Sequence, residues 1–273
     1  MKHFFTFLLT LVVTLGWAQK KELKQAQKLY KSAKISEAKA SLDANQALLE
    51  SAELKYAAPY NLLRSQISLA EEAYQASYDY LQLAQKSSGL SSKTDEQKRL
   101  LISAVINTAI EQSENKEFVA SAENLYLSYV IDPVANVDYL YYAASNAVNA
   151  SEYKLSLKYY QILKDIKYTG ITVKHYVTEV ANNTEIEVSA SEYSIYQKSK
   201  DYTNFRTEDT ESKFPEIVKN IALIYNQLGE KEKAIEAVIA ARAESPNDLG
   251  LILTEANIYI ELGEKEKFKV LMG

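Results

Sequence analysis

The chain contains no cysteine among its 273 residues. No disulfide can therefore stabilise the fold, even in an oxidising compartment. Thiol nucleophiles and thiolate metal ligands are excluded as well. A lipid-anchored lipoprotein, which needs a cysteine at its cleavage position, is excluded for the same reason. Packing and hydrogen bonds must hold this chain in shape.

Histidine is almost as scarce, with only His3 and His175. A multi-histidine metal centre cannot be built from two residues, and a Ser-His-Asp triad would have to use His175, which has no G-x-S-x-G elbow around it. The phosphate-binding patterns G-x-x-x-x-G-K-[ST] and G-x-G-x-x-G are missing too. Carboxylate pairs such as Glu71-Glu72 lie in amphipathic stretches, where acidic side chains usually form the solvated face. We predict that the chain is not an enzyme and holds neither a metal nor a cofactor.

Glycine and proline are few, 7 and 4 residues respectively. Together with 47% hydrophobic and 25% charged residues, this balance is typical of an ordered, helix-rich protein. Disorder is not expected over most of the chain.

The first 19 residues differ from the rest. They begin with MKH, and the apolar run FFTFLLTLVVTLGW follows. The next residues, AQKK, start with the small residue Ala18. A basic start, an apolar core of about 14 residues and a small-residue exit are the pattern of a secretory signal peptide. That core is shorter than the roughly 20 residues of a membrane span, so an uncleaved anchor is the less favoured alternative. We predict that residues 1–19 are removed beside Ala18 or Gln19 and that the chain is exported to the periplasm, with no membrane span left after cleavage.

The mature chain is acidic. Without residues 1–19 it keeps 30 basic and 36 acidic side chains, a net charge of −6. Because nucleic-acid binding is driven largely by basic side chains, this sign argues against a nucleic-acid partner.

One hexapeptide, LGEKEK, occurs twice near the C-terminal end, and its two copies start 34 residues apart. The copies span Leu228–Lys233 and Leu262–Lys267, and both follow an alanine and an Ile-Tyr pair, at Ala222 and Ile224-Tyr225 and at Ala256 and Ile258-Tyr259. This arrangement resembles the tetratricopeptide repeat, a 34-residue helix–turn–helix unit. The resemblance implies an all-α solenoid of stacked helix pairs. The departures are Val218 and Ile252, where the family prefers Trp, and Phe268, where a small residue is expected.

The glycine of each hexapeptide fits the end of a first helix. The residue after the last helical turn often adopts a left-handed backbone, which glycine tolerates best. We therefore expect Gly229 and Gly263 to end the first helices, and Glu230 and Glu264 to open the second helices at the positive end of the helix dipole.

Weaker copies of the unit are expected in residues 20–169. In each, an aromatic or branched residue at the start of the second helix is followed three positions later by a small one; the four pairs are Ile35/Ala38, Tyr74/Ser77, Phe118/Ser121 and Tyr153/Ser156. Between the second and third copies lies KSSGLSSK, a predicted linker, and Thr94 to Gln97 is expected to form the capping box of the next helix.

Residues 170–212 break the pattern. The segment GITVKHYVTEVANNTEIEVSA is rich in β-branched residues, and Asn182-Asn183 predicts a two-residue turn, so we expect an inserted β-hairpin. Ser189 and Glu192 then predict a capped short helix, after which YTNFRTEDTESK is expected to lead back to the repeats at 213–273. The insertion is expected either to join the binding face or to act as a spacer, and His175 within it to be a surface or packing residue.

The tetratricopeptide resemblance implies a concave groove lined by first helices. Carried over position by position, the expected groove residues are Lys219, Leu223, Asn226, Gln227, Leu253, Asn257, Ile260, Tyr141, Ser145 and Asn149. The carboxylate clamp of some family members is incomplete, because Leu223 stands where the clamp has Asn. A mixed, partly apolar groove suits an amphipathic or extended peptide.

These expectations favour an exported scaffold or adaptor that binds a protein or peptide of the cell envelope. The alternative is a glycan- or ligand-binding module of the envelope that uses exposed members of the 21 tyrosines. The sequence stops in the second helix of its last repeat, so we further expect residues 250–273 to be the least stable unit, and the open end either to pair with another chain or to continue in a longer protein.

Overall fold

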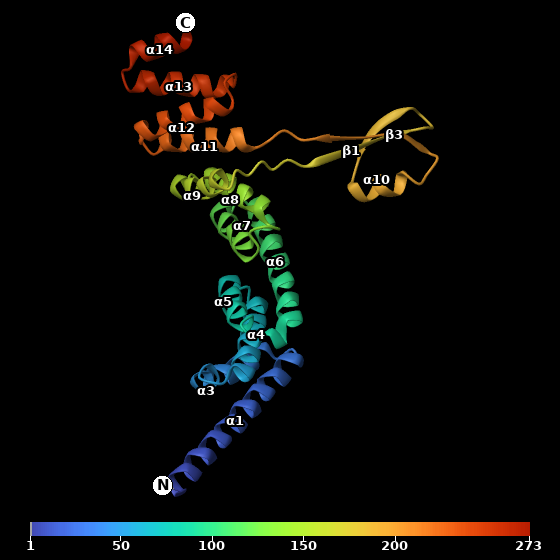
Figure 1. Ribbon diagram of the computed structural model, residues 1–273, viewed down its shortest axis with the longest axis vertical. Helices are drawn as coiled ribbons and strands as arrows, with labels where there is room; N and C mark the ends of the chain where they lie inside the picture. The colour runs from blue at the N-terminus through green and yellow to red at the C-terminus, as the bar shows by residue number, and fades with distance from the viewer. Residues whose placement is uncertain (1) are drawn as a thin grey trace. The chain divides into compact units, whose positions relative to one another are not determined.

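The computed structural model describes residues 2–273, with side chains from Trp17 onwards. Met1 and the side chains of residues 2–16 lie outside that description, so most of the predicted signal peptide does too, and its removal stays a prediction. The chain divides into two compact units, unit 1 up to Asn136 and unit 2 from Val137 to Gly273. Each unit is built mainly of antiparallel helix pairs (Figure 1).

Unit 1 contains three helix pairs, in which a first helix is followed by a second: α1 with α2, α4 with α5, and α6 with α7. Its elements are α1 (Lys2–Lys31), α2 (Ile35–Ala44), α3 (Gln46–Glu50), α4 (Leu54–Ala70), α5 (Tyr74–Ala84), the 3-10 turn η1 (Ser88–Leu90), α6 (Ser91–Glu114) and α7 (Phe118–Ile131).

Unit 2 contains three more pairs, α8 with α9, α11 with α12, and α13 with α14, and an insertion between α9 and α11. Its elements are α8 (Val137–Asn149), α9 (Tyr153–Asp165), β1 (Val173–Glu179), β2 (Thr184–Val188), α10 (Ala190–Tyr196), β3 (Tyr202–Asp209), α11 (Phe214–Gln227), α12 (Lys231–Glu244), α13 (Leu249–Glu261) and α14 (Lys265–Met272). Helices α9 and α11 pack against each other across the insertion. No residue of α14 is fully buried.

All six pairs share one turn. Two residues before each second helix, the backbone has a positive φ between 57° and 75°, at Ala33, Glu72, Lys116, Ser151, Gly229 and Gly263. The amide of the next residue donates to the carbonyl oxygen five residues earlier, for example from Glu230 to Tyr225 at 2.9 Å and from Glu117 to Gln112 at 2.7 Å. This is the Schellman motif, which satisfies carbonyl groups left open at the end of a helix. The predicted roles of Gly229 and Gly263 are confirmed.

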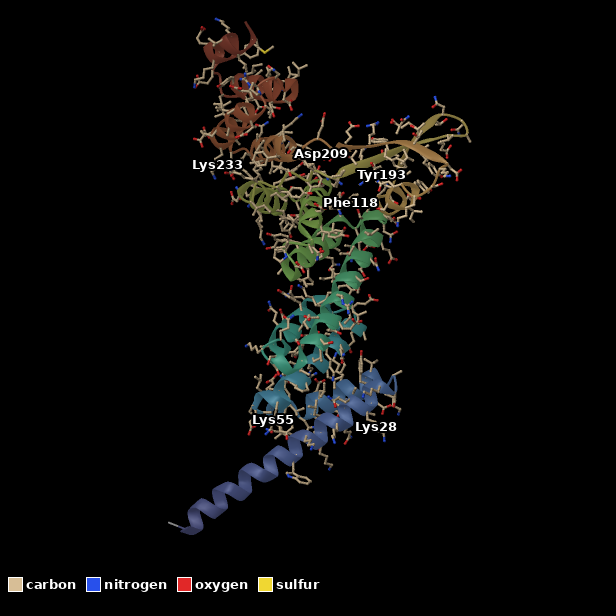
Figure 2. The ribbon with its side chains drawn as sticks, turned by 45° about the vertical axis from the view of Figure 1, so that its right-hand side comes forward. Lys28, Lys55, Phe118, Tyr193, Asp209 and Lys233 are labelled. Carbon is tan, nitrogen blue, oxygen red and sulfur yellow. The ribbon has the colours of Figure 1, made fainter. Side chains whose placement is uncertain are left out.

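The two helices of a pair touch at a small residue. The four second helices predicted from weaker copies begin at Ile35, Tyr74, Phe118 (labelled in Figure 2) and Tyr153, and the small residue three positions later is fully buried in each. In three of them it is a serine whose hydroxyl donates to a first-helix carbonyl twelve residues earlier, at 2.6 to 2.9 Å: Ser77 to Ser65, Ser121 to Ala109 and Ser156 to Ala144. A larger side chain would push the helices apart and break this bond.

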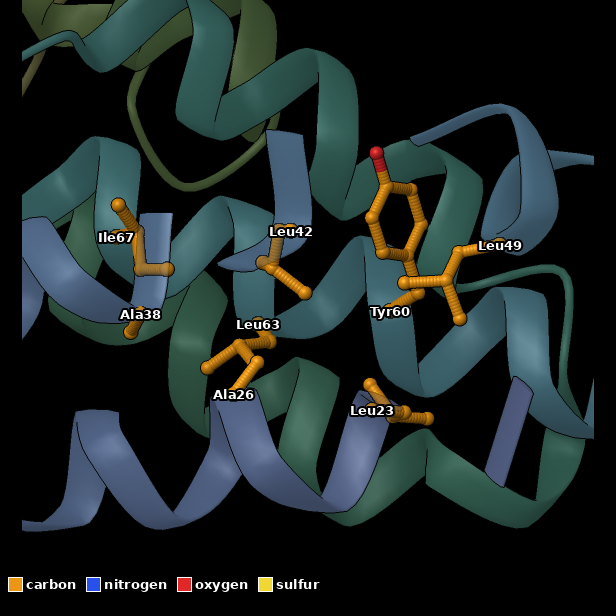
Figure 3. Packing of buried hydrophobic residues seen from close by; sticks show 8 residues of the cluster. All are labelled: Leu23, Ala26, Ala38, Leu42, Leu49, Tyr60, Leu63 and Ile67. Carbon is orange, nitrogen blue, oxygen red and sulfur yellow. The ribbon is translucent and has the colours of Figure 1, made fainter. Parts of the chain in front are cut away.

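Apolar side chains from both helices of a pair, and from the next first helix, share one core. In unit 1 this core joins Leu23 and Ala26 of α1 to Leu42 of α2 and to Tyr60 and Leu63 of α4 (Figure 3). Each pair therefore buries its apolar side against its neighbour, as stacked repeats do.

The insertion is a three-stranded antiparallel sheet with strand order β2-β1-β3, not a two-stranded hairpin alone. The predicted hairpin is present, but four residues, 180–183, connect β1 to β2, because Glu179 pairs with Thr184; Asn183 has the positive φ that was expected. The segment expected to lead back to the repeats forms β3 and pairs with β1. Its aromatic and threonine residues at Tyr202, Thr203 and Phe205 carried a strand signal that the charged residues after them obscured.

The two predicted capping boxes have different outcomes. The backbone amide of Glu192 donates to Ser189 Oγ at 3.2 Å, and the amide of Ser189 donates to the Glu192 carboxylate at 2.8 Å, so this box is confirmed. The box at Thr94 is wrong. Helix α6 already begins at Ser91, within the expected linker, and the buried Thr94 hydroxyl donates to the Ser91 carbonyl at 2.9 Å. A hydroxyl inside the first turn can bond back to its own helix without acting as a cap.

We predict that Lys116→Gly stabilises the protein. Lys116 has φ 64°, which costs a residue with a Cβ about 1 kcal/mol that glycine avoids. The midpoint of urea unfolding should rise, by an amount equivalent to about 0.5–1 kcal/mol. The matched control is Glu123→Gly, at an exposed position inside α7, which should lower stability by a similar amount. A destabilised Lys116→Gly would contradict the shared turn.

We also predict that the inserted module can be excised. The amide of Thr210 donates to the carbonyl of Thr172 at 2.9 Å, which is already the bond that closes a four-residue turn. Replacing residues 173–209 with Asn-Gly should therefore preserve the helical circular dichroism of the remaining chain, since that dipeptide favours a two-residue hairpin turn. Loss of most helical signal would show that the module is part of the core of unit 2.

Candidate functional site

The predicted groove residues lie on the three first helices of unit 2. Tyr141, Ser145 and Asn149 come from α8, Lys219, Leu223, Asn226 and Gln227 from α11, and Leu253, Asn257 and Ile260 from α13. Contacts link these helices in order: Tyr141 on α8 reaches Glu216 on α11, and Lys219 on α11 reaches Asp248 at the start of α13. The ten residues therefore belong to one row of neighbouring first helices.

Six of the ten are accessible. Leu223, Leu253 and Ile260 are 37%, 55% and 58% exposed, and the amide side chains of Asn149, Gln227 and Asn257 are exposed as well. Exposed branched side chains beside exposed amides offer both apolar contact and backbone hydrogen bonding to an extended peptide. A peptide could reach this part of the row on α11 and α13 without displacing internal contacts.

Three of the other four members of the row make contacts inside the protein. The Tyr141 hydroxyl donates to Glu216 at 2.8 Å, and the Ser145 hydroxyl lies 3.2 Å from the Tyr160 hydroxyl. The Lys219 ammonium lies 3.9 Å from the Asp248 carboxylate. These three side chains hold neighbouring helices together. Asn226 is half-buried, and its Oδ1 finds no hydrogen-bond partner among the described residues.

A tyrosine cluster fixes the point where the insertion leaves the helices. Tyr168, just after α9, donates to Asp138 at 2.5 Å, and the Lys213 ammonium lies 4.3 Å from the centre of the Tyr141 ring. Gly170 has φ 56°, and a Cβ there would come within 3 Å of Tyr168 and Lys213. No local sequence pattern indicates this cluster, because its partners lie up to 75 residues apart.

Burial raises the pKa of both Tyr141 and Tyr168, and the hydrogen bonds to Glu216 and Asp138 raise it further. A neighbouring carboxylate favours the neutral phenol because ionisation would place two negative charges side by side. Both hydroxyls therefore act as donors at neutral pH and lock the base of the insertion.

Unit 1 carries a hollow that the sequence did not predict. It has a volume of about 450 Å³ and lies between α1, α4 and the start of α6. Its floor is apolar, with Leu62 and Leu63 buried, and two exposed lysines, Lys31 and Lys93, stand at its rim. Neither lysine has an ion-pair partner among the residues that the structure describes. The full lining is Gln27, Tyr30, Lys31, Pro59, Leu62, Leu63, Gln66, Leu90 and Lys93.

The hollow escaped prediction because its residues come from the weaker repeat copies. The expected groove residues lie on α8, α11 and α13, whereas the hollow is lined mainly by the first helices of unit 1. The signal that could have found it is the pair Gln27 and Gln66, polar residues on first helices beside apolar neighbours.

From Trp17 onwards, no group of three or more His, Asp or Glu side chains is arranged to hold a metal ion. Within the same part of the chain, no helix has the length and apolar character needed to cross a membrane.

No protein-family model and no curated protein sequence matches the chain. Solved structures with similar helix arrangements include PilF of Pseudomonas aeruginosa, at TM-score 0.33 and 8% identity over 94% of this chain and 90% of that one. A tetratricopeptide repeat protein of Parabacteroides merdae has TM-score 0.33 and 14% identity over 93% of this chain and 77% of that one. YrrB, described as having an unusual peptide-binding site, has TM-score 0.28 and 12% identity over 86% and 90%.

At these TM-scores the superpositions are loose, and the fold is assigned from the chain itself. Six helix pairs share one left-handed turn. In five of them a small residue is fully buried at the same position of the second helix, and in the last pair the departure at Phe268 remains. The fold is of the tetratricopeptide type. In this tetratricopeptide-like chain, the first helices of each unit provide the surfaces on which a ligand could lie.

We predict that the tyrosine cluster stabilises unit 2 only below alkaline pH. Because the folded-state pKa of Tyr141 and Tyr168 lies above the ordinary value of 10.0, their contribution is complete below that pH and is lost as pH rises through the folded values. Urea unfolding from about pH 8 to about pH 11 should show a steeper loss of stability for the natural chain than for a Tyr141→Phe/Tyr168→Phe double variant.

At neutral pH each of these substitutions should cost about 1 kcal/mol, the net worth of one hydrogen bond. The control is Tyr142→Phe, because the Tyr142 side chain is 48% exposed. This substitution should change neither the stability at neutral pH nor its dependence on pH. Equal pH dependence in the natural chain and the double variant would contradict the role of the two hydroxyls.

Proposed function

We propose that this chain is an exported scaffold or adaptor that holds an extended segment of another envelope protein against its first helices. Export is inferred from the N-terminal pattern of a basic start, an apolar core and a small-residue exit. The binding role is inferred from the surface of the stacked helix pairs. Their first helices form an extended surface on which another chain can bind.

The hollow in unit 1 carries this proposal. A volume of about 450 Å³ is large enough for one or two side chains of a peptide, and its apolar floor of Pro59, Leu62 and Leu63 gives the burial that favours binding. The ammonium groups of Lys31 and Lys93 stand at the rim without ion-pair partners among the described residues. They suit a carboxylate on the ligand, from an acidic side chain or a chain terminus.

The exposed row on α11 and α13 supports the same function in unit 2. Leu223, Leu253 and Ile260 are branched, exposed and on neighbouring helices. Their apolar surface is kept open to solvent while exposed amides lie beside it, a combination that suits the alternating side chains of an extended peptide.

The glycan-binding alternative depends on exposed tyrosine rings. All 21 tyrosines lie within the residues whose side chains the structure describes, and only Tyr142 is exposed. The others are buried or half-buried in the helix pairs and in the inserted module, and a single exposed ring offers little area for stacking on a sugar. The observations therefore favour the peptide-binding proposal.

Capture from an envelope extract tests the proposal. The natural chain should recover a protein, and Lys31→Glu/Lys93→Glu should lose it because the rim then repels a ligand carboxylate. Leu253→Glu should lose any protein that uses the row in unit 2. The matched control is Lys154→Glu/Lys198→Glu, two exposed lysines outside both surfaces.

Three outcomes decide between the functions. Loss of the captured protein with the surface variants but not with the control supports a first-helix binding site. Equal recovery by all variants would refute both candidate surfaces. Recovery of glycan without protein would reverse the order of the two functions.

A further inference from the structure

One face of α1 carries a row of five lysines. It runs from Lys20 at one end to Lys31 at the other, over roughly 17 Å of helix, with three further lysines between them. At 3.6 residues per turn these five side chains fall within an arc of about 100°. We call this the basic stripe; its members are Lys20, Lys21, Lys24, Lys28 and Lys31. Trp17 precedes the stripe on the same face of the helix.

The opposite face of α1 anchors the helix. Leu23 and Ala26 are buried in the core of unit 1, and the Gln19 side-chain amide donates to the carbonyl of Leu48 at 3.1 Å. The stripe is therefore held on a packed helix and faces away from the core, as Lys28 does in Figure 2. Trp17 is 77% exposed.

The lysines of the stripe lack counter-charges. None of the five forms an ion pair within the part of the chain that the structure describes, whereas the neighbouring Lys34 and Lys39 pair with Glu37 and Glu71. The one acidic residue in this part of α1, Glu22, lies off the stripe and contacts the Asn45 amide at 3.5 Å.

The sign of charge is strongly segregated along the chain. Residues 17–39 carry seven basic and two acidic side chains, a net charge of +5, and residues 40–273 carry 23 basic and 34 acidic side chains, a net charge of −11. An acidic protein that keeps one unpaired basic row presents a localised positive surface, which attracts a polyanion to that place alone.

We propose that the basic stripe docks unit 1 onto an anionic lipid surface. A straight row of lysines on one helix face can engage many headgroups of a flat, negatively charged bilayer at once. The apolar stems of lysine side chains also pack favourably at a membrane interface while the ammonium groups stay in water. Trp17 would leave with the predicted signal peptide and is not needed for this contact. The five lysines lie beyond the predicted cleavage position, so the mature chain keeps them.

Other polyanions fit less well. The negative charge of residues 40–273 would repel nucleic acid, which a protein must approach with much of its surface. An acidic partner protein, including the inserted module of a second copy with its four basic and eight acidic side chains in residues 170–212, would have to match the row residue by residue. A bilayer needs no such match, because its headgroups move to the lysines.

Vesicle co-sedimentation of the full chain tests the proposal. The readout is the ratio of binding to vesicles containing phosphatidylglycerol over binding to neutral phosphatidylcholine vesicles, since the apolar run at 4–17 contributes to both. Because each lysine near an anionic surface is worth roughly fivefold in partitioning, Lys20→Gln/Lys21→Gln/Lys24→Gln/Lys28→Gln should lower this ratio at least about tenfold. Lys31 is left unchanged because it also lines the hollow in unit 1. Raising the salt concentration should lower the ratio in the natural chain.

The matched control removes four exposed lysines elsewhere, Lys86→Gln/Lys154→Gln/Lys198→Gln/Lys200→Gln, and so changes the net charge equally. It should keep the ratio within about twofold of the natural value. An equal loss in both variants, or no preference for anionic vesicles in the natural chain, would overturn the proposal. Salt-sensitive self-association that the stripe variant abolishes, without vesicle preference, would assign the stripe to a second copy instead.

Discussion

The structure depends on a single backbone constraint, the left-handed turn that joins the two helices of each pair. A positive φ reverses the chain within two residues, and the amide that follows returns to satisfy a carbonyl at the end of the first helix. The second helix must then run back along the first at close range. That closeness favours a small residue where they meet, as in five of the six pairs, and serine there adds a hydrogen bond to the opposing backbone. Turn, small residue and shared core thus follow from one another.

This constraint explains which parts of the fold are predictable from sequence. Gly229 and Gly263 predict their turns directly, because glycine favours a positive φ. In the earlier pairs, where Ala33 or Lys116 stands at the turn, the second helix is predicted instead from its small residue, Ala38 or Ser121. The third strand at Tyr202–Asp209 was missed because its partner, β1, lies more than twenty residues away and its own alternation is broken by charges. At Thr94 the local sequence is misleading in another way. It has the pattern of a capping box, but the helix begins one turn earlier, at Ser91.

The candidate site was only partly predictable, for a physical reason. A position within the repeat predicts which side chains of a first helix point toward the groove. It does not predict whether a neighbouring residue already forms a contact with them. Leu253 and Ile260 are exposed, whereas the Tyr141 hydroxyl donates a hydrogen bond to Glu216, which lies 75 positions further along the chain. The hollow in unit 1 depends on three helices together, so no single repeat carries its pattern. Tertiary contacts divide the predicted row into a part that is exposed to solvent and a part whose side chains hold neighbouring helices together.

We propose that first helices, not second helices, carry the binding surface. Site-specific photocrosslinking in an envelope extract tests it directly, with the crosslinker at Leu253 on α13 or at Ile239 on α12. The two positions are 55% and 50% exposed, so accessibility alone cannot separate them. The account predicts a discrete crosslinked protein at Leu253 and none at Ile239. The same crosslinked protein at Ile239, with none at Leu253, would contradict it.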